Sequence, residues 1–311
     1  MFVNVPLHAQ YAMYAVLVLL IIASSVRFLL RMKSPDKDLT ELRQRIQSWW
    51  WMIGILFSIL IVSKTVSIIF FAVLSFLALK EFFSIVPTRQ ADRRVLFWAY
   101  LAIPVQYYWV ASEWYGMFLV FIPVYVFLFL PMRAVFIGET KGFIRSLGTI
   151  HWGVMLSVLC VSHIAYLLQL PVKNPQAGGM GLVIFLIFIT QFNDVCQYIW
   201  GKMLGKHKII PKVSPNKTWE GFIGGVATVT VISGFVAPYL TPLTWMEGLM
   251  AGTLIAISGF VGDVVISSVK RDLAIKDSGT LIPGHGGLLD RIDSLIYTAP
   301  LFFHFLHYLH Y

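Results

Sequence analysis

The sequence predicts an all-α protein that crosses a membrane with about ten helices and carries a polar site in its C-terminal half. Of its 311 residues, 58% are hydrophobic and only 13% are charged, whereas about a quarter of the residues in a soluble domain are charged. The apolar residues gather in runs long enough to span a bilayer, and the basic residues fall in alternate connections between those runs. A soluble globular fold is therefore excluded.

A membrane-spanning helix needs about 20 mostly apolar residues. Runs of this kind predict spans at 11–32, 49–64, 65–79, 95–111, 117–132, 150–170, 180–200, 222–240, 246–269 and 295–309. Lys64 separates the second span from the third and predicts a tight hairpin there. The first span lacks a basic leading segment and a small-residue cleavage site, so we expect a retained helix and not a signal peptide.

Lys and Arg side chains are concentrated in the connections that follow the first, third, fifth, seventh and ninth spans. The alternate connections at 112–116, 171–179 and 241–245 carry only Lys173. Because basic loops of membrane proteins favour the cytoplasm, we expect both termini outside, and the short loops favour a bacterial inner membrane. We therefore attribute the formal net charge of +9 to basic loops that are attracted to anionic lipid, and not to a nucleic-acid-binding surface.

Two further features concern organisation. The chain divides into N-terminal membrane helices at 1–179 and a C-terminal catalytic region at 180–311, and segment 34–48 predicts either a helix on the membrane surface or a solvated linker helix. Glycines four residues apart permit close helix packing and also a homodimer; they occur at 201/205, 221/225 and 248/252.

Polar side chains inside two spans are unusual. Asn193 and Asp194 lie in the seventh span and Asp263 in the ninth, all in the half of the span nearer the basic loops. Charged groups in a bilayer are costly and usually face a cavity, a partner or a substrate path. We expect each acid to face a polar site, with a hydrogen bond between helices as the alternative.

Segment 270–294 concentrates the charges that the rest of the chain avoids. Asp290 and Asp293 are three residues apart, so on a helix both carboxylates point the same way. Oxygen donors of this kind suit Mg²⁺ more than zinc. Around them are four cations and a glycine-rich turn, which suit an anionic ligand such as a phosphate: Lys270, Arg271, Lys276, Arg291, Gly284, Gly286 and Gly287.

A second anion-suited stretch runs from Ser214 to Gly221. Ser214 and Thr218 can donate hydrogen bonds near a predicted helix start, and Lys217 adds a positive charge. Together with segment 270–294, this stretch predicts a membrane enzyme that acts on a phosphorylated lipid or a nucleotide.

The run from Ser267 to Gly279, continued from Leu281 to Ser294, closely resembles the signature of phosphatidate cytidylyltransferases, the CDP-diacylglycerol synthases. The shared pattern begins with Ser and Lys-Arg, passes through Lys-Asp, and ends in His-Gly-Gly and Asp-Arg-x-Asp. The resemblance extends to Asp194, Tyr198 and the Ser-Pro-x-Lys-Thr-x-Glu-Gly stretch, and so covers about 190–294. Gln197 departs from the small residue usual before the Tyr, and could change the substrate that fits or bond a neighbouring helix.

The resemblance implies transfer of CMP from CTP to phosphatidic acid, giving CDP-diacylglycerol and pyrophosphate. It implies Mg²⁺, and a second cation is left open, at Asp263, Asp290 and Asp293. Lys270, Arg271 and Lys276 would hold phosphates and stabilise the departing pyrophosphate, and His285 would contact phosphate or backbone or, less favoured, act as a base. The remaining substrate-binding expectations are Asp194, Tyr198, Ser214, Lys217, Thr218, Glu220, Ser267, Asp277, Gly286, Gly287 and Arg291.

Two alternatives remain open. The first is a cytidylyltransferase that acts on another phosphorylated lipid, such as a polyprenyl phosphate, and Gln197 and the divergent first half motivate it. The second is an ion-coupled transporter that uses Asp194 and Asp263, although transport would not explain the dense polar motif at 270–294.

Overall fold

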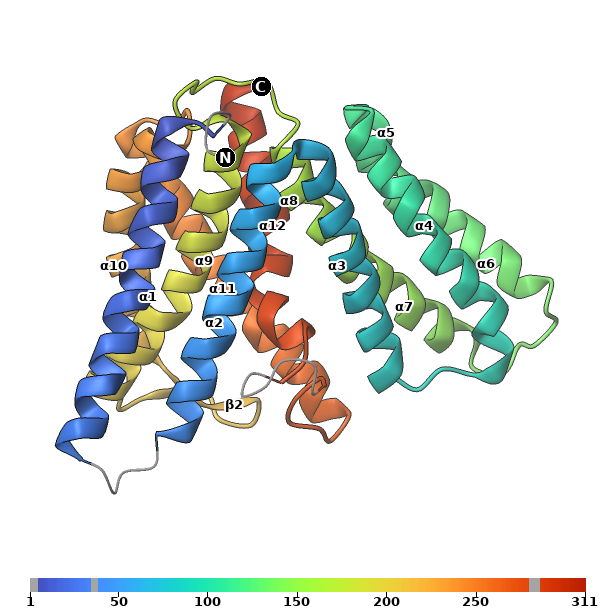
Figure 1. The fold of residues 1–311 in the computed structure, drawn as a ribbon. Helices are drawn as coiled ribbons and strands as arrows, with labels where there is room; N and C mark the ends of the chain where they lie inside the picture. The colour runs from blue at the N-terminus through green and yellow to red at the C-terminus, as the bar shows by residue number, and fades with distance from the viewer. Residues whose placement is uncertain (1–4, 35–38, 280–285) are drawn as a thin grey trace.

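The computed structural model describes residues 5–34, 39–279 and 286–311. Within these ranges the chain forms membrane-length helices and one two-stranded hairpin (Figure 1). Eight single helices have the bounds α1 (Leu7–Lys33), α2 (Thr40–Val62), α3 (Lys64–Ile85), α4 (Arg93–Ala111), α9 (Gly178–Leu204), α10 (Trp219–Leu240), α11 (Trp245–Asp272) and α12 (Leu289–His310). The all-α membrane fold is therefore confirmed.

Two further spans are composite, each with a single π-helical stretch between α-helical parts. They are built from α5 (Tyr115–Val120), η2 (Phe121–Val126) and α6 (Phe127–Val135), and from α7 (Phe143–Val154), η3 (Met155–Cys160) and α8 (Val161–Leu167). A short 3₁₀ turn, η1 (Gln90–Asp92), precedes α4. Within the described ranges, eight of these helical segments are long and apolar enough to cross a membrane. Helices α4 and α12 are not among the eight, although they pack beside them.

Several helices extend beyond the predicted spans because polar residues continue them. Helix α7 begins at Phe143, seven residues before the predicted start at 150. The segment predicted as a short helix at 34–48 is continuous with the next span, since α2 runs from Thr40 to Val62 as one helix, with residues 35–38 outside the described part. Helix α3 extends beyond the predicted end at 79 to Ile85, close to Pro87, which disfavours helix in the residue before it. Helix α12 begins at Leu289, six residues before the predicted start at 295. The tight hairpin at Lys64 is confirmed, with Ser63 capping α3.

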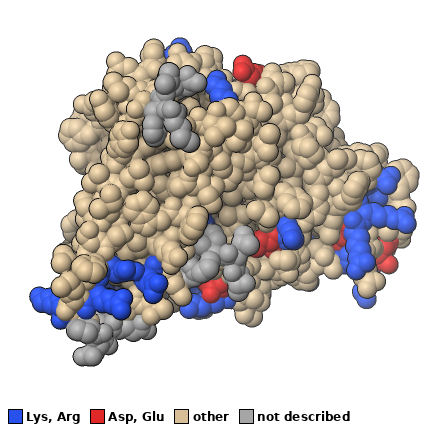
Figure 2. Space-filling view, in the orientation of Figure 1, with Lys and Arg blue, Asp and Glu red and all other residues tan. Residues whose placement is uncertain are grey.

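The helices place most basic residues at one end of the molecule, which we call the basic end. It comprises the end of α1 and start of α2, the α3–α4 and α6–α7 connections, the hairpin after α9 and the connection between α11 and α12. Figure 2 shows Lys and Arg gathered along this end, and Figure 1 shows both termini at the opposite end. The basic connections, which alternate with the other connections along the sequence, therefore lie together at one end of the molecule.

The C-terminal helices form the packed unit that holds the polar residues. Helix α10 packs against α9 and α11, and α12 packs against α11, α8 and α9. Helices α1 and α3 lie beside α9 and α12 respectively, while α4, α6 and α7 lie on the far side of α3 (Figure 1). Many side chains on the outer surfaces are large and apolar, as expected of surfaces that face lipid.

The four-residue glycine spacings serve packing inside the chain. A Cβ on Gly221 would lie 2.9 Å from the Cα of Gly201 on α9, and a Cβ on Gly248 would lie 3.1 Å from the Cα of Gly234 on α10. These glycines therefore let α10 approach both neighbours closely. Since they are used within one chain, they give no support to the predicted homodimer, which stays a prediction.

We expect Gly252→Ala to lower the free energy of unfolding by about 1–3 kcal/mol, the usual cost of overpacking. The added methyl would overlap Ser233 and lie 3.1 Å from the Cα of Thr230, so α10 and α11 would have to separate. Gly148→Ala is the matched control, because nothing lies within 4 Å of its Cβ position. Thermal unfolding of the purified variants in one detergent checks the prediction, and equal midpoints for the two variants would contradict it.

Candidate active site

Three acidic side chains from three different helices meet near the basic end. Asp194 comes from α9, Asp263 from α11 and Asp293 from the second turn of α12. Ser294, the residue after Asp293, contacts Asp194 at 3.1 Å, and Gly262, the residue before Asp263, packs against the Asp293 carbonyl. We call these three residues the acid cluster. Asp194 and Asp263 therefore lie among other polar side chains, and Ser294 of α12 also gives Asp194 the hydrogen bond between helices that was the alternative.

The neighbours of the acid cluster hold its carboxylates in place. Lys217 Nζ lies 2.7 Å from Asp263 Oδ2, and Ser267 Oγ donates to Asp263 Oδ1 at 3.2 Å. Ser294 Oγ donates to Asp194 Oδ2 at 3.1 Å, and the Ser294 amide donates to Asp293 Oδ1 at 2.7 Å. Among the described residues, the ion pair between Lys217 and Asp263 is the only one that involves the acid cluster.

Lys217 reaches the acid cluster from β2, the second strand of a small antiparallel hairpin. The hairpin pairs β1 (Lys208–Ile210) with β2 (Ser214–Thr218), and Thr218 then caps α10 by accepting from the Gly221 amide at 3.2 Å. Burial alone would lower the pKa of the Lys217 ammonium, but Asp263 and Asp194 outweigh burial and raise the pKa above its usual value. Lys217 therefore stays positively charged throughout the neutral pH range.

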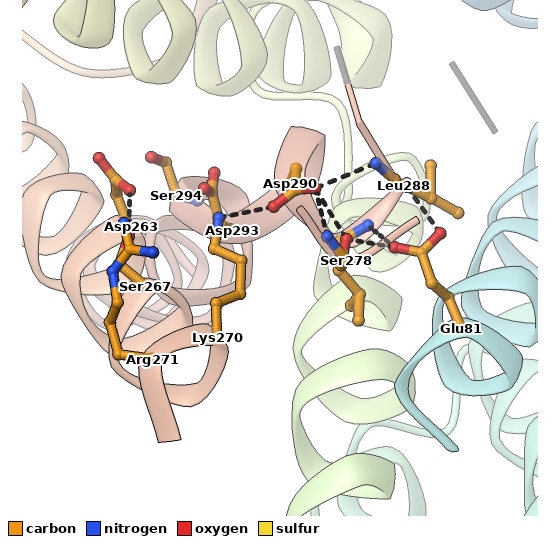
Figure 3. Close-up of polar contacts among 12 residues, drawn as sticks. Glu81, Asp263, Ser267, Lys270, Arg271, Ser278, Leu288, Asp290, Asp293 and Ser294 are labelled. Atoms are coloured by element: carbon orange, nitrogen blue, oxygen red, sulfur yellow. Dashed lines mark hydrogen bonds and ion pairs between the residues drawn. The ribbon is translucent and has the colours of Figure 1, made fainter. Parts of the chain in front are cut away.

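A second polar cluster surrounds Asp290 in the first turn of α12 (Figure 3). Lys270 Nζ of α11 lies 2.6 Å from Asp290 Oδ1, and both side chains are buried. Asp290 Oδ2 accepts from the Ser278 amide at 2.8 Å, the Ser278 hydroxyl at 2.9 Å and the Gly287 amide at 3.0 Å. Glu81 of α3 approaches the same serine from the other side. Asp290 is thus fully engaged by groups of the chain itself.

The three-residue spacing of Asp290 and Asp293 does place both near α11, but the two carboxylates have different partners. Asp290 pairs with Lys270, while Asp293 lies with Asp194 and Asp263. The predicted metal set of Asp263, Asp290 and Asp293 is therefore divided between two clusters. The physical reason is that Lys270 and three N–H and O–H donors already compensate the charge of Asp290.

The fit to a divalent cation depends on the remaining acids. Within the described residues, no three His, Cys, Asp or Glu side chains are arranged to hold a metal ion as they stand. The acid cluster nevertheless offers only oxygen donors, which are the ligands Mg²⁺ prefers, from three carboxyl groups beside one ammonium group. This donor chemistry fits a magnesium ion.

A pocket of about 450 Å³ opens beside the acid cluster: it is lined by Asp194 of the cluster and by Lys217, which pairs with Asp263. Three lysines line the pocket and only one acid, so it suits a phosphate-bearing ligand. It lies between the end of α9 and the β1–β2 hairpin, and its wall includes Tyr198, Lys202, Lys208, Ser214, Asn216 and Thr218. A larger cavity of about 680 Å³ lies between the α3–α4 and α6–α7 connections and shares no residue with either polar cluster.

Comparison with known proteins decides the family. The model of the cytidylyltransferase family matches residues 43–309, which is most of the chain. This protein belongs to the cytidylyltransferase family. It is also similar to the uncharacterized protein YnbB of Escherichia coli K12, with 45% identity over 291 residues, covering 93% of this chain and 95% of YnbB.

Two phosphatidate cytidylyltransferases match a shorter part of the chain. The enzyme from Mycobacterium leprae is 41% identical over 121 residues, covering 39% of each chain. The enzyme from Staphylococcus aureus strain COL is 38% identical over 128 residues, covering 40% of this chain and 49% of its own. This cytidylyltransferase therefore spans less than half the length of either enzyme in these alignments.

Several residues that were predicted to act in the site lie at its edge or form hydrogen bonds that stabilise the fold. Glu220 accepts from the amides of Lys206 and His207 and from the His207 ring at 2.6 Å, so it stabilises the turn before β1 and does not join the acid cluster. Arg271 Nε donates to the Val213 carbonyl at 3.1 Å and supports the hairpin. Its guanidinium is exposed and does not contact Asp290.

The other predicted residues are placed as follows. Tyr198 is exposed at the pocket, with the Lys202 ammonium 5.9 Å from its ring centre, and Lys276 and Asp277 are exposed in the connection after α11. Gly286 has φ 78° and, with Gly287, borders Asp290. His285 lies outside the described residues.

Glu81 was not predicted as part of the site, because it belongs to the N-terminal half, where no motif marks it. The structure also adds detail for two residues that the sequence had singled out. Gln197 is buried, donates to Asn193 Oδ1 at 3.1 Å and accepts from Lys217 Nζ at 3.4 Å, so it bonds a neighbouring residue and also lines the pocket. Arg291 was predicted to bind substrate, but only the structure shows that its buried Nε has no partner among the described groups.

Proposed function

We propose that this protein transfers CMP from CTP to phosphatidic acid or a related lipid phosphate, at the basic end of the molecule and on the cytoplasmic side of an inner membrane. One observation carries the proposal: the lysine-lined pocket includes Asp194 of the acid cluster, and its Lys217 pairs with Asp263 of the same cluster. A cation-binding group of carboxylates thus adjoins a phosphate-binding pocket. The partial similarity to two phosphatidate cytidylyltransferases supports the choice of acceptor.

In the proposed reaction, a phosphate oxygen of the lipid forms a bond to the α-phosphorus of CTP, and the bond to the β-phosphate oxygen breaks to release pyrophosphate. The attacking phosphate is already ionised at neutral pH, so it needs no general base. The principal obstacle is repulsion between two anions. Fixed positive charges that are already in place lower this barrier without reorganisation.

Each polar group of the chain then has a proposed task. Lys217 contributes the fixed charge between pocket and acid cluster, and the Nε of Arg291, which has no partner among the described residues, would donate to a phosphate oxygen. Lys270 holds Asp290 at the start of α12. Asp194, Asp263 and Asp293 would hold Mg²⁺, which when bound neutralises triphosphate charge and polarises the α-phosphate.

The test uses purified protein in detergent with labelled CTP, Mg²⁺ and a panel of acceptors. The panel contains phosphatidic acid, a polyprenyl phosphate, a neutral diacylglycerol and no lipid. We expect label to enter phosphatidic acid, to depend on Mg²⁺, and to be lost in Asp293→Asn but kept in Glu139→Gln, an exposed change far from the site. Label in the polyprenyl phosphate instead would change the acceptor, and no label in any lipid would refute nucleotidyl transfer to a lipid.

A further inference from the structure

Helix α12, which carries Asp290, Arg291 and Asp293, starts without a cap of its own. Its N-cap residue is Leu288, which has no side chain that can accept from the first-turn amides. Unpaired amides at a buried helix start are costly, and they usually receive an acceptor from Ser, Thr, Asp or Asn at the N-cap. The acceptor for α12 must therefore come from elsewhere in the chain.

Glu81 of α3 supplies that acceptor. Its Oε2 accepts from the Leu288 amide at 2.8 Å, and its Oε1 accepts from the Leu289 amide at 2.9 Å. A carboxylate at this position also interacts favourably with the positive end of the α12 dipole. Glu81 thus caps α12 from another membrane helix.

The same carboxylate holds the connection that precedes α12. The Ser278 hydroxyl lies 2.5 Å from Glu81 Oε1 and 2.9 Å from Asp290 Oδ2. A serine hydroxyl has one proton to donate, and its shorter contact is with Glu81, while the Ser278 amide donates to Asp290 Oδ2 at 2.8 Å. Ser278 therefore links Glu81 to Asp290 through its hydroxyl and its amide (Figure 3).

The fit around Glu81 is close enough to require glycine beside it. A Cβ on Gly287 would overlap both the Glu81 carboxylate and the Ser278 hydroxyl. Because the Gly287 amide also donates to Asp290 Oδ2 at 3.0 Å, the backbone that touches Glu81 is the backbone that orients Asp290. A displacement of Glu81 would be passed directly to Asp290.

We propose that Glu81 is a positioning residue for nucleotidyl transfer, which fixes the start of α12 and thereby sets where Asp290, Arg291 and Asp293 stand relative to the substrates. The inference rests on the proposed function and deepens it. It gives the N-terminal helices an indirect part in the reaction, through the start of α12, although α3 lies outside the region that resembles the cytidylyltransferase signature. Glu81 itself touches no reacting atom.

The test compares Glu81→Ala, Glu81→Gln and Glu81→Asp with Ser84→Ala in the same detergent. Ser84 is an exposed neighbour on α3, and its hydroxyl donates to the Glu81 backbone carbonyl and not to the Glu81 carboxylate. We expect Glu81→Ala to lower kcat about 10²-fold, because small displacements of reacting groups have costs of that size. We expect KM for CTP to change by less than about threefold, because positioning acts mainly on the transition state.

Two further readouts separate positioning from a general loss of structure. Hydrogen exchange at the Leu288 and Leu289 amides should accelerate in Glu81→Ala while exchange elsewhere in α3 and α12 stays as in the unmodified protein. Glu81→Asp keeps the charge and should recover part of kcat, and Glu81→Gln keeps the shape if the alanine variant does not fold.

The outcomes distinguish this inference from the proposed function. If the unmodified protein labels no lipid, the proposed function fails, while faster exchange at Leu288 and Leu289 still establishes the cap. If the unmodified protein is active and kcat in Glu81→Gln and Glu81→Ala stays within about twofold of it, the positioning role is overturned. Equal losses in Ser84→Ala, or a loss of kcat without faster exchange at these two amides, would overturn it as well.

Discussion

Replacing Asp293 with asparagine is expected to raise the thermal unfolding midpoint of the metal-free protein while lowering its transfer activity about 10³-fold, the scale found when one electrostatic group is removed from an active site. The acid cluster brings three carboxylates together, and Lys217 pairs with Asp263. Asparagine removes the cost of burying a third carboxyl group beside two others and leaves no ion-pair partner behind. The asparagine oxygen can still accept from the Ser294 amide, as Asp293 does now at 2.7 Å.

Added magnesium makes this prediction more specific. A ligand that binds only the folded state raises its stability, so Mg²⁺ should raise the midpoint of the unmodified protein and of Glu139→Gln, but not that of Asp293→Asn. Thermal unfolding with and without Mg²⁺, followed by the labelled-CTP assay on the same samples, measures both effects. A variant less stable than the unmodified protein would show that Asp293 is a structural residue, and a variant with full activity would remove the acid cluster from the mechanism.

The sequence predicted the helices well where only the bilayer matters and less well where charges have partners. An apolar run must form a helix in lipid, because no water is available for its backbone, and the ten predicted spans all correspond to helical segments. The predicted end of α3 was too early and the predicted start of α12 was too late. The reason is that Glu81, Asp290 and Asp293 were interpreted as loop residues. Their hydrogen bonds and ion pairs, which depend on other helices, let the helices continue through them.

The site was predictable to the extent that its residues violate the rules for membrane helices. Asp194 and Asp263 stood out because a carboxylate in a span is costly, and the structure brings them together. The division of Asp290 from Asp293 could not be derived, since a spacing of three residues describes one helix and not the lysine on its neighbour. Glu81 carries no such signal: it lies 197 residues from Ser278 in the sequence, at the end of a run that looks like an ordinary span.

Lys270→Met is expected to lower the free energy of unfolding by about 3–5 kcal/mol, the usual cost of leaving one partner of a buried ion pair alone. The side chains of Lys270 and Asp290 are only 13% and 5% exposed, and their charged atoms lie 2.6 Å apart. Asp290→Asn should have a similar cost, because it leaves the Lys270 ammonium without its carboxylate. Neither single variant can therefore show whether these residues act in the reaction or only in folding.

The double variant Lys270→Met/Asp290→Asn resolves this ambiguity. Replacing both charges leaves neither unpaired, so stability should return to within about 1 kcal/mol of the unmodified protein, with a coupling energy measurable by a double-mutant cycle. Asparagine can still accept from the Ser278 and Gly287 amides, which keeps the start of α12 in place. If the pair acts in catalysis, this stable double variant should still transfer about 10²-fold less CMP than the unmodified protein. Recovery of activity together with stability would mean that Lys270 and Asp290 hold the fold and that the phosphates are bound by Lys217 and Arg291.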